Sequence, residues 1–204
     1  MGKLIGEAYK QYWIARAAKT MSYVGYFKHN AADVQAQADF FWGYLQKRLP
    51  GVAGVHAVAE LGCGWGRMLS RLAEAYPAAV MLGIDIVPKA LEHGRKQFPK
   101  LTFVLADHYP EKLPQVDLLV TCTCLQHITD PVVWAQVVAS IHRGVRPGGT
   151  LLMLENATPG SAQHMADRRL PDYVMAFDGF TFSPTELIYD RDGQSHFVLS
   201  GRRD

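Results

Sequence analysis

A short run of glycines after an apolar segment is the feature of this sequence best suited to chemistry. Gly62, Gly64 and Gly66 alternate with bulkier residues, and acidic side chains stand just before them at Glu60 and, after the next apolar segment, at Asp85. Glycine lets the chain turn tightly and approach a ligand closely, and unpaired N–H groups where a helix begins attract ligand oxygen atoms. A carboxylate about 20 residues further on can accept hydrogen bonds from both hydroxyls of a ribose. The pattern therefore indicates a site for a ribose-containing ligand.

The elements that must position these residues alternate between strands and helices. Apolar residues at helical spacing separate most of the strand segments, and Pro88 and the pair Asp130-Pro131 supply helix starts. Short apolar runs bounded by Gly, Pro or Asp indicate strands that are buried on both faces. These runs are residues 55–62, 79–87, 101–107, 115–124 and 150–157. This order predicts an α/β fold with a parallel sheet covered by helices on both faces.

The flanking segments depart from this alternation. Asn30 and Asp33 can cap a helix that ends at the next Pro-Gly pair, whereas residues 108–114 hold too much proline for more than one helical turn. Asp192 and Gly193 lie between two runs of alternating polarity. This arrangement predicts a β-hairpin near the C-terminus.

Several motifs within residues 55–157 together are typical of one enzyme family. They are ELGCGWG, the GID that ends in Asp85, the LAD that ends in Asp107, the segment VDLLVTCTCLQHI and the RPGG turn before LLMLE. A dinucleotide-binding fold would place a third glycine where Arg67 stands. The motifs instead resemble those of the class I S-adenosylmethionine-dependent methyltransferases. The resemblance implies a Rossmann-like α/β fold with a doubly wound, mostly parallel seven-stranded sheet that ends in a C-terminal antiparallel hairpin.

The same resemblance implies S-adenosylmethionine as the cofactor, S-adenosylhomocysteine as its product, and a role for each residue of the motifs. Glu60 would lie near the ammonium group of the cofactor, Asp85 would hold the ribose hydroxyls and Ile86 would pack on the adenine. The remaining residues are expected to line the methionine part or the adenine edge: Gly62, Cys63, Gly64, Gly66, Thr121, Cys122 and Thr123 for the former, and Ala106, Asp107 and His108 for the latter. The alternative for each is a structural role, such as capping a loop for Asp85 or Asp107.

His127, just beyond the fourth predicted strand, is the candidate catalytic residue. Methyl transfer from a sulfonium is an in-line displacement, and alignment in a dry pocket supplies much of its rate. A general base is needed only if the acceptor arrives protonated, and imidazole titrates near neutral pH. The alternative is that His127 is a structural residue that contacts the neighbouring loop.

Acceptor recognition is expected from segments outside the shared motifs. The N-terminal segment and the stretch after the fifth predicted strand are rich in aromatic and basic residues, which could cover the strand ends and exclude water. The residues predicted to contact the acceptor are Tyr23, Tyr26, His164, Arg168 and Tyr173. The alternative is that these side chains only pack on the sheet. We expect residues 1–50 to form a helical cap over the active site, and residues 51–204 to form the cofactor-binding domain.

Composition narrows the class of partners. The chain has 204 residues with 21 basic and 19 acidic side chains, a net charge of +2, and no block of like charges. A nucleic-acid partner is therefore not expected. Three cysteines in apolar or glycine-rich surroundings favour a reducing compartment over disulfides, and no second Cys or His pair follows at zinc-site spacing. With no membrane-length apolar run and no signal-peptide pattern at the start, we expect a cytoplasmic protein, monomeric or homodimeric, with no metal.

Together these observations predict a methyltransferase that transfers a methyl group from S-adenosylmethionine to an oxygen or nitrogen atom of a small molecule. One alternative is a non-catalytic scaffold or cofactor sensor with the same fold. Another is methylation of protein or nucleic acid. The near-neutral charge disfavours this last alternative, and so does TCTCLQHI, which stands where an Asn/Asp-Pro-Pro-Tyr/Phe element would.

Overall fold

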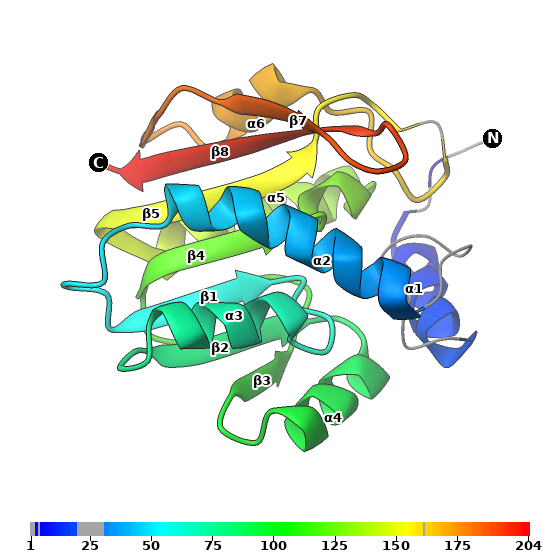
Figure 1. The fold of residues 1–204 in the computed structure, drawn as a ribbon. Coiled ribbons are helices and arrows are strands. Elements are labelled where there is room, and N and C mark those ends of the chain that lie inside the picture. Colours follow the sequence, from blue (N-terminus) through cyan, green and yellow to red (C-terminus); the bar gives the residue numbers. More distant parts are fainter. Residues whose placement is uncertain (1–2, 4, 20–30, 161) are drawn as a thin grey trace.

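The computed structural model describes residues 3, 5–19, 31–160 and 162–204. Tyr23 and Tyr26, predicted to contact the acceptor, lie outside the described residues, as does the predicted helix cap Asn30. The described part forms a single sheet flanked by helices (Figure 1).

The strands of the sheet follow the predicted apolar runs closely. They are β1 (Ala57–Leu61), β2 (Val80–Asp85), β3 (Thr102–Leu105), β4 (Val116–Cys122), β5 (Val145–Asn156), β6 (Phe180–Phe182), β7 (Glu186–Tyr189) and β8 (Ser195–Arg203). Their order is β3-β2-β1-β4-β5-β8-β6, with β7 also paired to β8. The first five strands run parallel to one another, while β8 runs antiparallel to β5, β6 and β7.

The predicted architecture is confirmed with one refinement. The sheet has eight strands rather than seven, because two short strands share the place beside β8: β6 pairs with its end at Gly201–Arg203 and β7 with its beginning at Ser195–Val198. The predicted hairpin around Asp192 and Gly193 is the β7–β8 connection. Because the chain reverses direction in this hairpin, β8 runs antiparallel to β5 in the otherwise parallel sheet.

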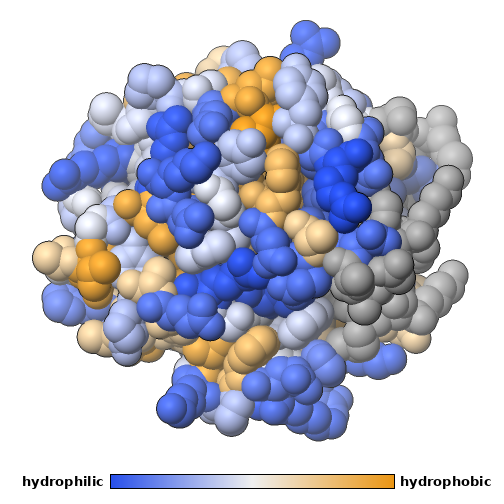
Figure 2. Space-filling view, viewed as in Figure 1, coloured by the Kyte–Doolittle hydropathy of each residue, from blue (hydrophilic) through white to orange (hydrophobic). Residues whose placement is uncertain are grey.

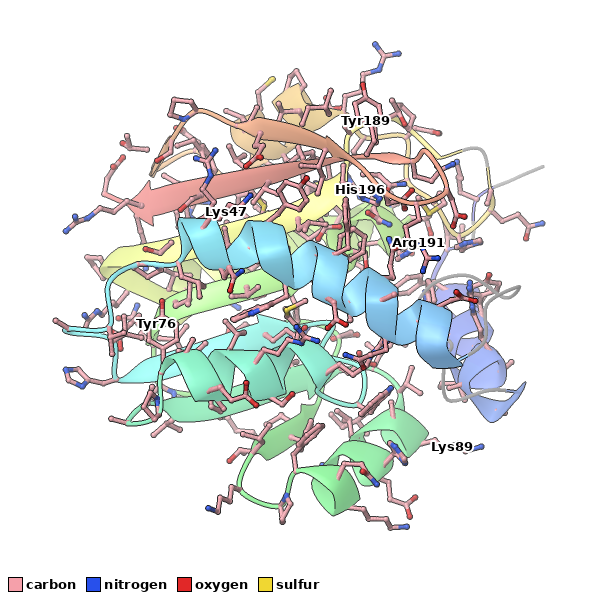
Figure 3. The ribbon with its side chains drawn as sticks, viewed as in Figure 1. Lys47, Tyr76, Lys89, Tyr189, Arg191 and His196 are labelled. Atoms are coloured by element: carbon pink, nitrogen blue, oxygen red, sulfur yellow. The ribbon has the colours of Figure 1, made fainter. Side chains whose placement is uncertain are left out.

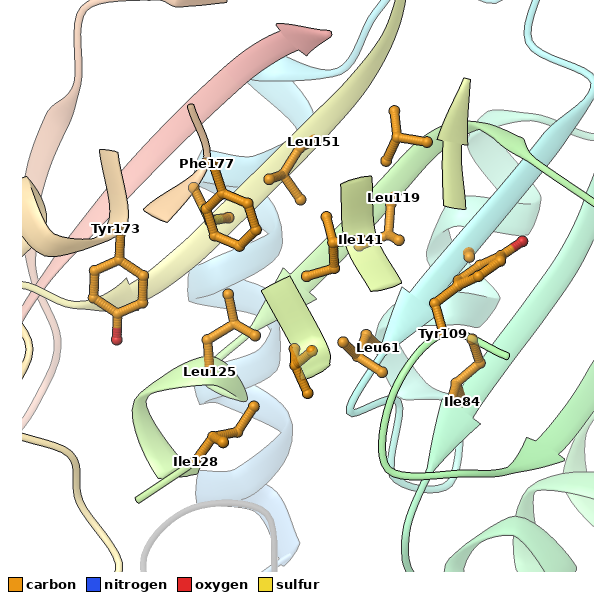
Figure 4. Packing of buried hydrophobic residues seen from close by; sticks show 14 of the residues in the cluster. Leu61, Ile84, Tyr109, Leu119, Leu125, Ile128, Ile141, Leu151, Tyr173 and Phe177 are labelled. Atoms are coloured by element: carbon orange, nitrogen blue, oxygen red, sulfur yellow. The ribbon is translucent and has the colours of Figure 1, made fainter. Parts of the chain in front are cut away.

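Helices cover both faces of the sheet. The helical elements are α1 (Glu7–Lys19), α2 (Ala31–Leu45), η1 (Gln46–Arg48), α3 (Arg67–Ala75), α4 (Pro88–Gln97), η2 (Leu125–His127), α5 (Pro131–Gly144) and α6 (Leu170–Ala176). In Figure 1, α2, α3 and α4 lie in front of the sheet, α5 and α6 lie behind it, and α1 stands at the end toward which the parallel strands point. Each face has its own apolar core, and Figure 4 shows the core on the α5 and α6 side.

Local sequence explains why the helices begin where they do. Asp130 caps α5, since its carboxylate accepts hydrogen bonds from the backbone N–H groups of Val132 and Val133. Pro131 lacks a backbone N–H, but the first position of a helix does not need one. In α3, Met68, Leu69 and Leu72 form the buried stripe that the spacing predicted. As predicted, no helix forms in residues 108–114.

Two segments differ from the expectation. The RPGG segment, predicted as a turn, lies within β5, whose pairing with β4 shifts register between Val116 and Leu118. A bulge of this kind accommodates a glycine-rich segment inside a strand. The short helix α6 was not predicted either, because only its Tyr173 is buried and it shows no periodic stripe.

The face of the molecule that carries α2 is largely hydrophilic, with hydrophobic residues in separate groups (Figure 2). Among the described helices, none combines the length and the apolar composition that a membrane crossing requires.

Candidate active site

A cavity of about 700 Å³ lies where the parallel strands β1, β2, β4 and β5 end. Helices α1 and α2, the glycine turn with the start of α3, η2, the segment after β5 and the β7–β8 turn also contribute to its wall. This volume is in the range typical of small-molecule sites. Of the predicted site residues, those that line it are Glu60, Gly62, Cys63, Asp85, Ile86, Ala106, Asp107, Cys122, Thr123, His127 and His164. Gly64, Gly66, His108, Thr121, Arg168 and Tyr173 are not part of the wall.

The glycine turn bends sharply after β1, as the sequence predicted. Gly62, Gly64 and Gly66 have φ values of 77°, 56° and 94°, a backbone region that disfavours other residues. A Cβ atom on Gly62 would lie 2.3 Å from the Sγ atom of Cys124, so no side chain fits there. The turn therefore presents backbone, with Gly62 and Cys63, to the cavity.

Asp85 ties the glycine turn to the end of β2. Its Oδ2 atom accepts a hydrogen bond from the N–H of Gly64 at 2.8 Å, and its Oδ1 atom accepts one from the N–H of Val87 at 2.9 Å. Burial raises the pKa of this carboxyl, and these hydrogen bonds oppose the rise. The backbone N–H of Ile86 also donates to this carboxylate, which has about four acceptor positions in all and so keeps capacity for a ligand hydroxyl.

Glu60 is the buried acid whose hydrogen bonding is incomplete. Its side chain is 3% exposed, it lines the cavity, and its Oε2 atom has no hydrogen-bond partner among the described residues. Burial, and secondarily the charge of Asp85, raises the pKa of Glu60 to about 8. A cation placed beside it would favour ionisation and supply the missing partner. The residue therefore fits the ammonium group of the implied cofactor.

Asp107 connects the end of β3 with α1. Its carboxylate forms an ion pair with Lys10 at 2.6 Å and contacts Nδ1 of His108 at 2.6 Å. Although burial opposes it, hydrogen bonds from Lys10 and His108 lower the pKa of Asp107. The first helix is thus fastened beside the predicted adenine position, with Ala106 in the cavity wall.

The chain that leaves β4 forms the opposite wall. Thr123 has a φ of 51°, the one positive value outside glycine among the described residues, and its N–H donates to the carbonyl of Leu154 at 2.7 Å. Glu155, which the sequence analysis overlooked, is fully buried and accepts hydrogen bonds from the N–H groups of Cys124 at 3.3 Å and Gln126 at 3.1 Å. Burial raises the pKa of Glu155 to about 7. An acid at the end of the apolar run LLMLE was the available signal. Thr121 is buried in β4 behind this wall.

His127 lines the cavity, but both of its ring nitrogens have neighbours. Nδ1 lies 3.0 Å from the carbonyl of His164, so it carries the proton and donates, and Nε2 lies 3.4 Å from the amide nitrogen of Gln126. Burial lowers the pKa of His127 to about 3. Its ring packs edge-on against Trp13 of α1, with centroids 4.7 Å apart. The structure therefore contains the contact with a neighbouring loop that was the alternative to catalysis.

Two residues predicted to contact the acceptor serve the scaffold instead. Arg168 donates hydrogen bonds to the carbonyls of Leu125 at 3.2 Å and Ile128 at 2.7 Å and lies over the ring of Trp134. Tyr173 is 1% exposed within the core behind the sheet. Both side chains were predicted to contact the acceptor. Instead, Arg168 is held by the carbonyls beside η2 and Tyr173 by the apolar core, so neither lies in the cavity wall.

Several cavity residues come from segments that carry no motif. They are Tyr9, Trp13 and Arg16 of α1, Gln37 and Phe41 of α2, Gln126 and Asn156 at the strand ends, and Arg191, Gln194 and His196 at the β7–β8 turn. The Asp-Gly hairpin signal could have drawn attention to this last group, because strands that pair with β5 bring their turn to the same edge of the sheet.

Comparisons with known proteins agree with this geometry. Residues 58–149 match the methyltransferase domain family. Trans-aconitate 2-methyltransferase of Deinococcus radiodurans is 32% identical over 129 residues, which are 61% of this chain and 47% of that protein. An S-adenosylmethionine-dependent methyltransferase from Mesorhizobium loti superposes on 83% of this chain and 99% of its own length, with a TM-score of 0.65 and 22% identity.

A further solved structure includes the product of the implied cofactor. The N-methyltransferase NodS of Bradyrhizobium japonicum WM9, in complex with S-adenosyl-L-homocysteine, superposes on 87% of this chain and 90% of its own, with a TM-score of 0.67 and 14% identity. The chain spans about half or less of the curated relatives it matches, from 35% to 49% of the first three. The resemblance to class I S-adenosylmethionine-dependent methyltransferases is supported by the match of residues 58–149, slightly less than half of the chain, to the methyltransferase domain family and by the fold shared with the solved structures.

Proposed function

We propose that this class I methyltransferase domain transfers a methyl group from S-adenosylmethionine to an oxygen or nitrogen atom of a small molecule. The observation that carries the proposal is a single cavity that joins the glycine turn, the incompletely bonded Glu60 and the carboxylate of Asp85. The size of the cavity favours a small acceptor. The name of the Deinococcus relative, a trans-aconitate 2-methyltransferase, supports the same class.

Each end of the cofactor would have its own residues. Glu60 would bind the ammonium group, with Gly62, Cys63, Cys122 and Thr123 as the wall beside the methionine part. Asp85 would accept the ribose hydroxyls, and Ile86, Ala106 and Asp107 would surround the adenine. Gly64 and Gly66 would contribute by setting the shape of the turn, and Thr121 by packing in the strand behind it. His108 would contribute by its hydrogen bond with Asp107. When bound, the cofactor supplies an electrophilic methyl group on a sulfonium.

The acceptor would enter between α1, the strand ends and the β7–β8 turn. Trp13, His127 and His164 form an aromatic group at this side, with His127 and His164 stacked at 5.5 Å between centroids. Such a wall excludes water and orients a flat acceptor, which favours an in-line displacement. His127 stays a prediction as the base, since its low pKa makes it neutral but weakly basic at pH 7.

Calorimetry with S-adenosylhomocysteine tests the proposal. We expect saturable binding to the purified chain, and no binding at millimolar ligand would end the proposal. Turnover of methyl-labelled cofactor with a set of small acceptors then separates an enzyme from a scaffold of the same fold. Binding without methyl transfer to any small acceptor would favour the scaffold.

A further inference from the structure

A buried histidine and aspartate face each other at the β7–β8 turn. His196 is the second residue of β8, Asp190 follows β7, and the Nε2 atom of His196 lies 3.1 Å from Oδ2 of Asp190. The side chains are 2% and 0% exposed. Gln37 of α2 donates a second hydrogen bond to the same carboxylate oxygen at 3.2 Å. The pair is therefore fixed from two elements.

The hydrogen bond determines which nitrogen of His196 carries the proton. An ionised carboxylate only accepts, so Nε2 donates to Asp190 and Nδ1 keeps its lone pair. Nδ1 is buried and has no hydrogen-bond partner among the described residues. Buried polar atoms are nearly always paired, and an atom of a bound ligand is one partner that would complete the hydrogen bonding of Nδ1.

His196 is placed on the acceptor side of the cavity. It lines the cavity wall, pairs across the sheet with Asn156, and packs edge-on against Phe41 with centroids 5.0 Å apart. Figure 3 shows His196 and Arg191 at the end of the hairpin, beside α2. Glu60 and Asp85, which suit the cofactor, belong to β1 and β2 on the other side of β4. A group bound near His196 would thus approach from the side opposite the adenosyl position.

Two of the three cavity histidines, His127 and His196, differ in what stabilises their charged forms. For His127 the environment lowers the pKa to about 3, and neighbouring Arg16 and His164 add to the effect of burial. For His196 burial also lowers the pKa, but the hydrogen bond and the charge of Asp190 oppose it. His196 is therefore the histidine whose protonated form has a carboxylate to stabilise it.

We propose that His196 is the general base of the methyl transfer and that the acceptor is an aromatic hydroxyl compound, a phenol. The inference rests on the proposed function and assigns its acceptor class. Amines that arrive neutral and carboxylates need no base, whereas a hydroxyl does. An imidazole of modest basicity suits a phenol, whose pKa is about 10, better than an alcohol. The aromatic side chains of Phe41 and Trp13 suit a flat ring.

The phenolic proton passes to Nδ1 of His196 while an oxygen electron pair forms the bond to the methyl carbon. The carbon–sulfur bond breaks and its electron pair stays on sulfur, which becomes a neutral thioether. Asp190 stabilises the imidazolium, and His196 then releases the proton to solvent. Asp190 is a positioning residue here, because it acts through His196.

Matched variants and three related probes test this inference. His196→Gln keeps an amide donor near Asp190 and removes the base, while His127→Asn keeps a donor toward the His164 carbonyl. The probes are phenol, aniline and benzoate with methyl-labelled S-adenosylmethionine, which share a ring and differ in acceptor atom. We expect phenol to be methylated, and His196→Gln to lower its kcat by roughly 100-fold or more with S-adenosylhomocysteine affinity unchanged. His127→Asn decides between the two predicted bases: a larger loss of kcat in His127→Asn than in His196→Gln would assign the base to His127 and overturn the inference.

Asp190→Asn adds a readout that a structural role would not change. Other charged groups near His196 are Arg191 and Asp192 in the turn and Asp33 of α2, which pairs with Arg191 at 3.5 Å. Loss of the Asp190 charge should lower the pKa of His196, which moves the acidic limb of kcat/KM for phenol to lower pH and reduces the rate at neutral pH.

Nitrogen-15 NMR of His196 in the S-adenosylhomocysteine complex completes the test. We expect an unprotonated Nδ1 whose resonance moves when phenol is added. The inference is overturned by a protonated Nδ1, by methylation of aniline or benzoate but not phenol, by equal rates in wild type and His196→Gln, or by phenol that neither reacts nor shifts the resonance. If S-adenosylhomocysteine itself does not bind, the proposed function fails rather than this inference.

Discussion

The parallel strands begin at one edge of the sheet and end at the opposite edge, and the buried acids at these two edges differ in their hydrogen bonding. At the edge where the parallel strands begin, Asp117 of β4 is 6% exposed and accepts hydrogen bonds from the N–H groups of His56 at 2.6 Å and Ala57 at 2.8 Å. Its other oxygen pairs with Arg146 at 2.5 Å. At the edge where the strands end, Glu60 is buried just as deeply, but its Oε2 atom has no hydrogen-bond partner within the described part of the chain.

The difference separates a structural acid from one that is prepared for a ligand. Asp117 joins β1, β4 and β5 through backbone donors and a cation, so its charge is satisfied within the protein. Glu60 has a raised pKa, and its neighbour Asp85 adds negative charge to the same cavity. Buried charge without a partner is costly, and functional sites are where that cost is tolerated.

The largest expected effect concerns the structural edge. Asp117→Ala leaves two backbone donors and Arg146 without their acceptor, and we expect it to lower the free energy of unfolding by about 4 kcal/mol. Chemical denaturation measures this, with exposed Asp178→Ala as the control. Wild-type stability in Asp117→Ala would show that the two edges do not differ as described.

Substitution of Glu60 is expected to have the opposite effect and to raise the free energy of unfolding. Its ordinary pKa is 4.5 and its folded pKa is about 8, so the folded protein holds a proton that the unfolded chain releases, and stability falls as pH rises from 4.5 to 8. Glu60→Gln removes this contribution and should be more stable than wild type at pH 8, by about 4 kcal/mol. The difference in unfolding free energy between the two proteins, followed from pH 5 to pH 8, should widen steadily. A constant difference would contradict the raised pKa.

We also expect Glu60 to release a proton when a ligand with an ammonium group binds. At pH 7 Glu60 is mostly protonated, and a ligand ammonium group should ionise it. Calorimetric titration with S-adenosylhomocysteine in buffers of different ionisation enthalpy should show release of up to one proton, absent in Glu60→Gln. Equal proton release by both proteins would place the ammonium group elsewhere.

Asp85→Asn should act on affinity more than on stability. Loss of the charged acceptor is expected to weaken S-adenosylhomocysteine binding by about 2 kcal/mol, roughly 30-fold. Asp117→Asn is the matched control, since it alters a buried acid at the other edge and should leave affinity unchanged. Similar affinity losses in both variants would mean that the effect is general destabilisation.

The smallest effect is expected at Lys10, whose ion pair with Asp107 fastens α1. The lysine is partly exposed, so Lys10→Ala should change stability and affinity by less than about 1 kcal/mol. Lys96→Ala, which removes the exposed pair with Glu92, is the control. A tenfold loss of S-adenosylhomocysteine affinity in Lys10→Ala alone would instead make this pair part of the binding site.

Local signals explain which features the sequence predicted correctly. The cap at Asp130, the stripe of α3 and the bend at Gly62, Gly64 and Gly66 each depend on neighbouring residues, so spacing was enough to predict them. Asp85 was placed correctly beside the cavity because the ends of adjacent parallel strands meet at one edge.

Features that depend on distant contacts were not predictable in this way. Arg168 is held by carbonyls about 40 residues earlier in the chain, and Tyr173 fills a core that no motif defines. His196 reaches the cavity only because β8 pairs in one register with β5. Sequence spacing carries no information about such a register.

The backbone conformation of Thr123 matters for attempts to raise the thermal stability of the protein. A branched side chain in a left-handed backbone is unfavourable, yet this one stands in the cavity wall directly after β4. We expect selection for heat tolerance alone to favour relaxed replacements such as Thr123→Gly, and to yield slower enzymes in doing so. Engineering this scaffold therefore calls for selection on turnover and melting temperature together.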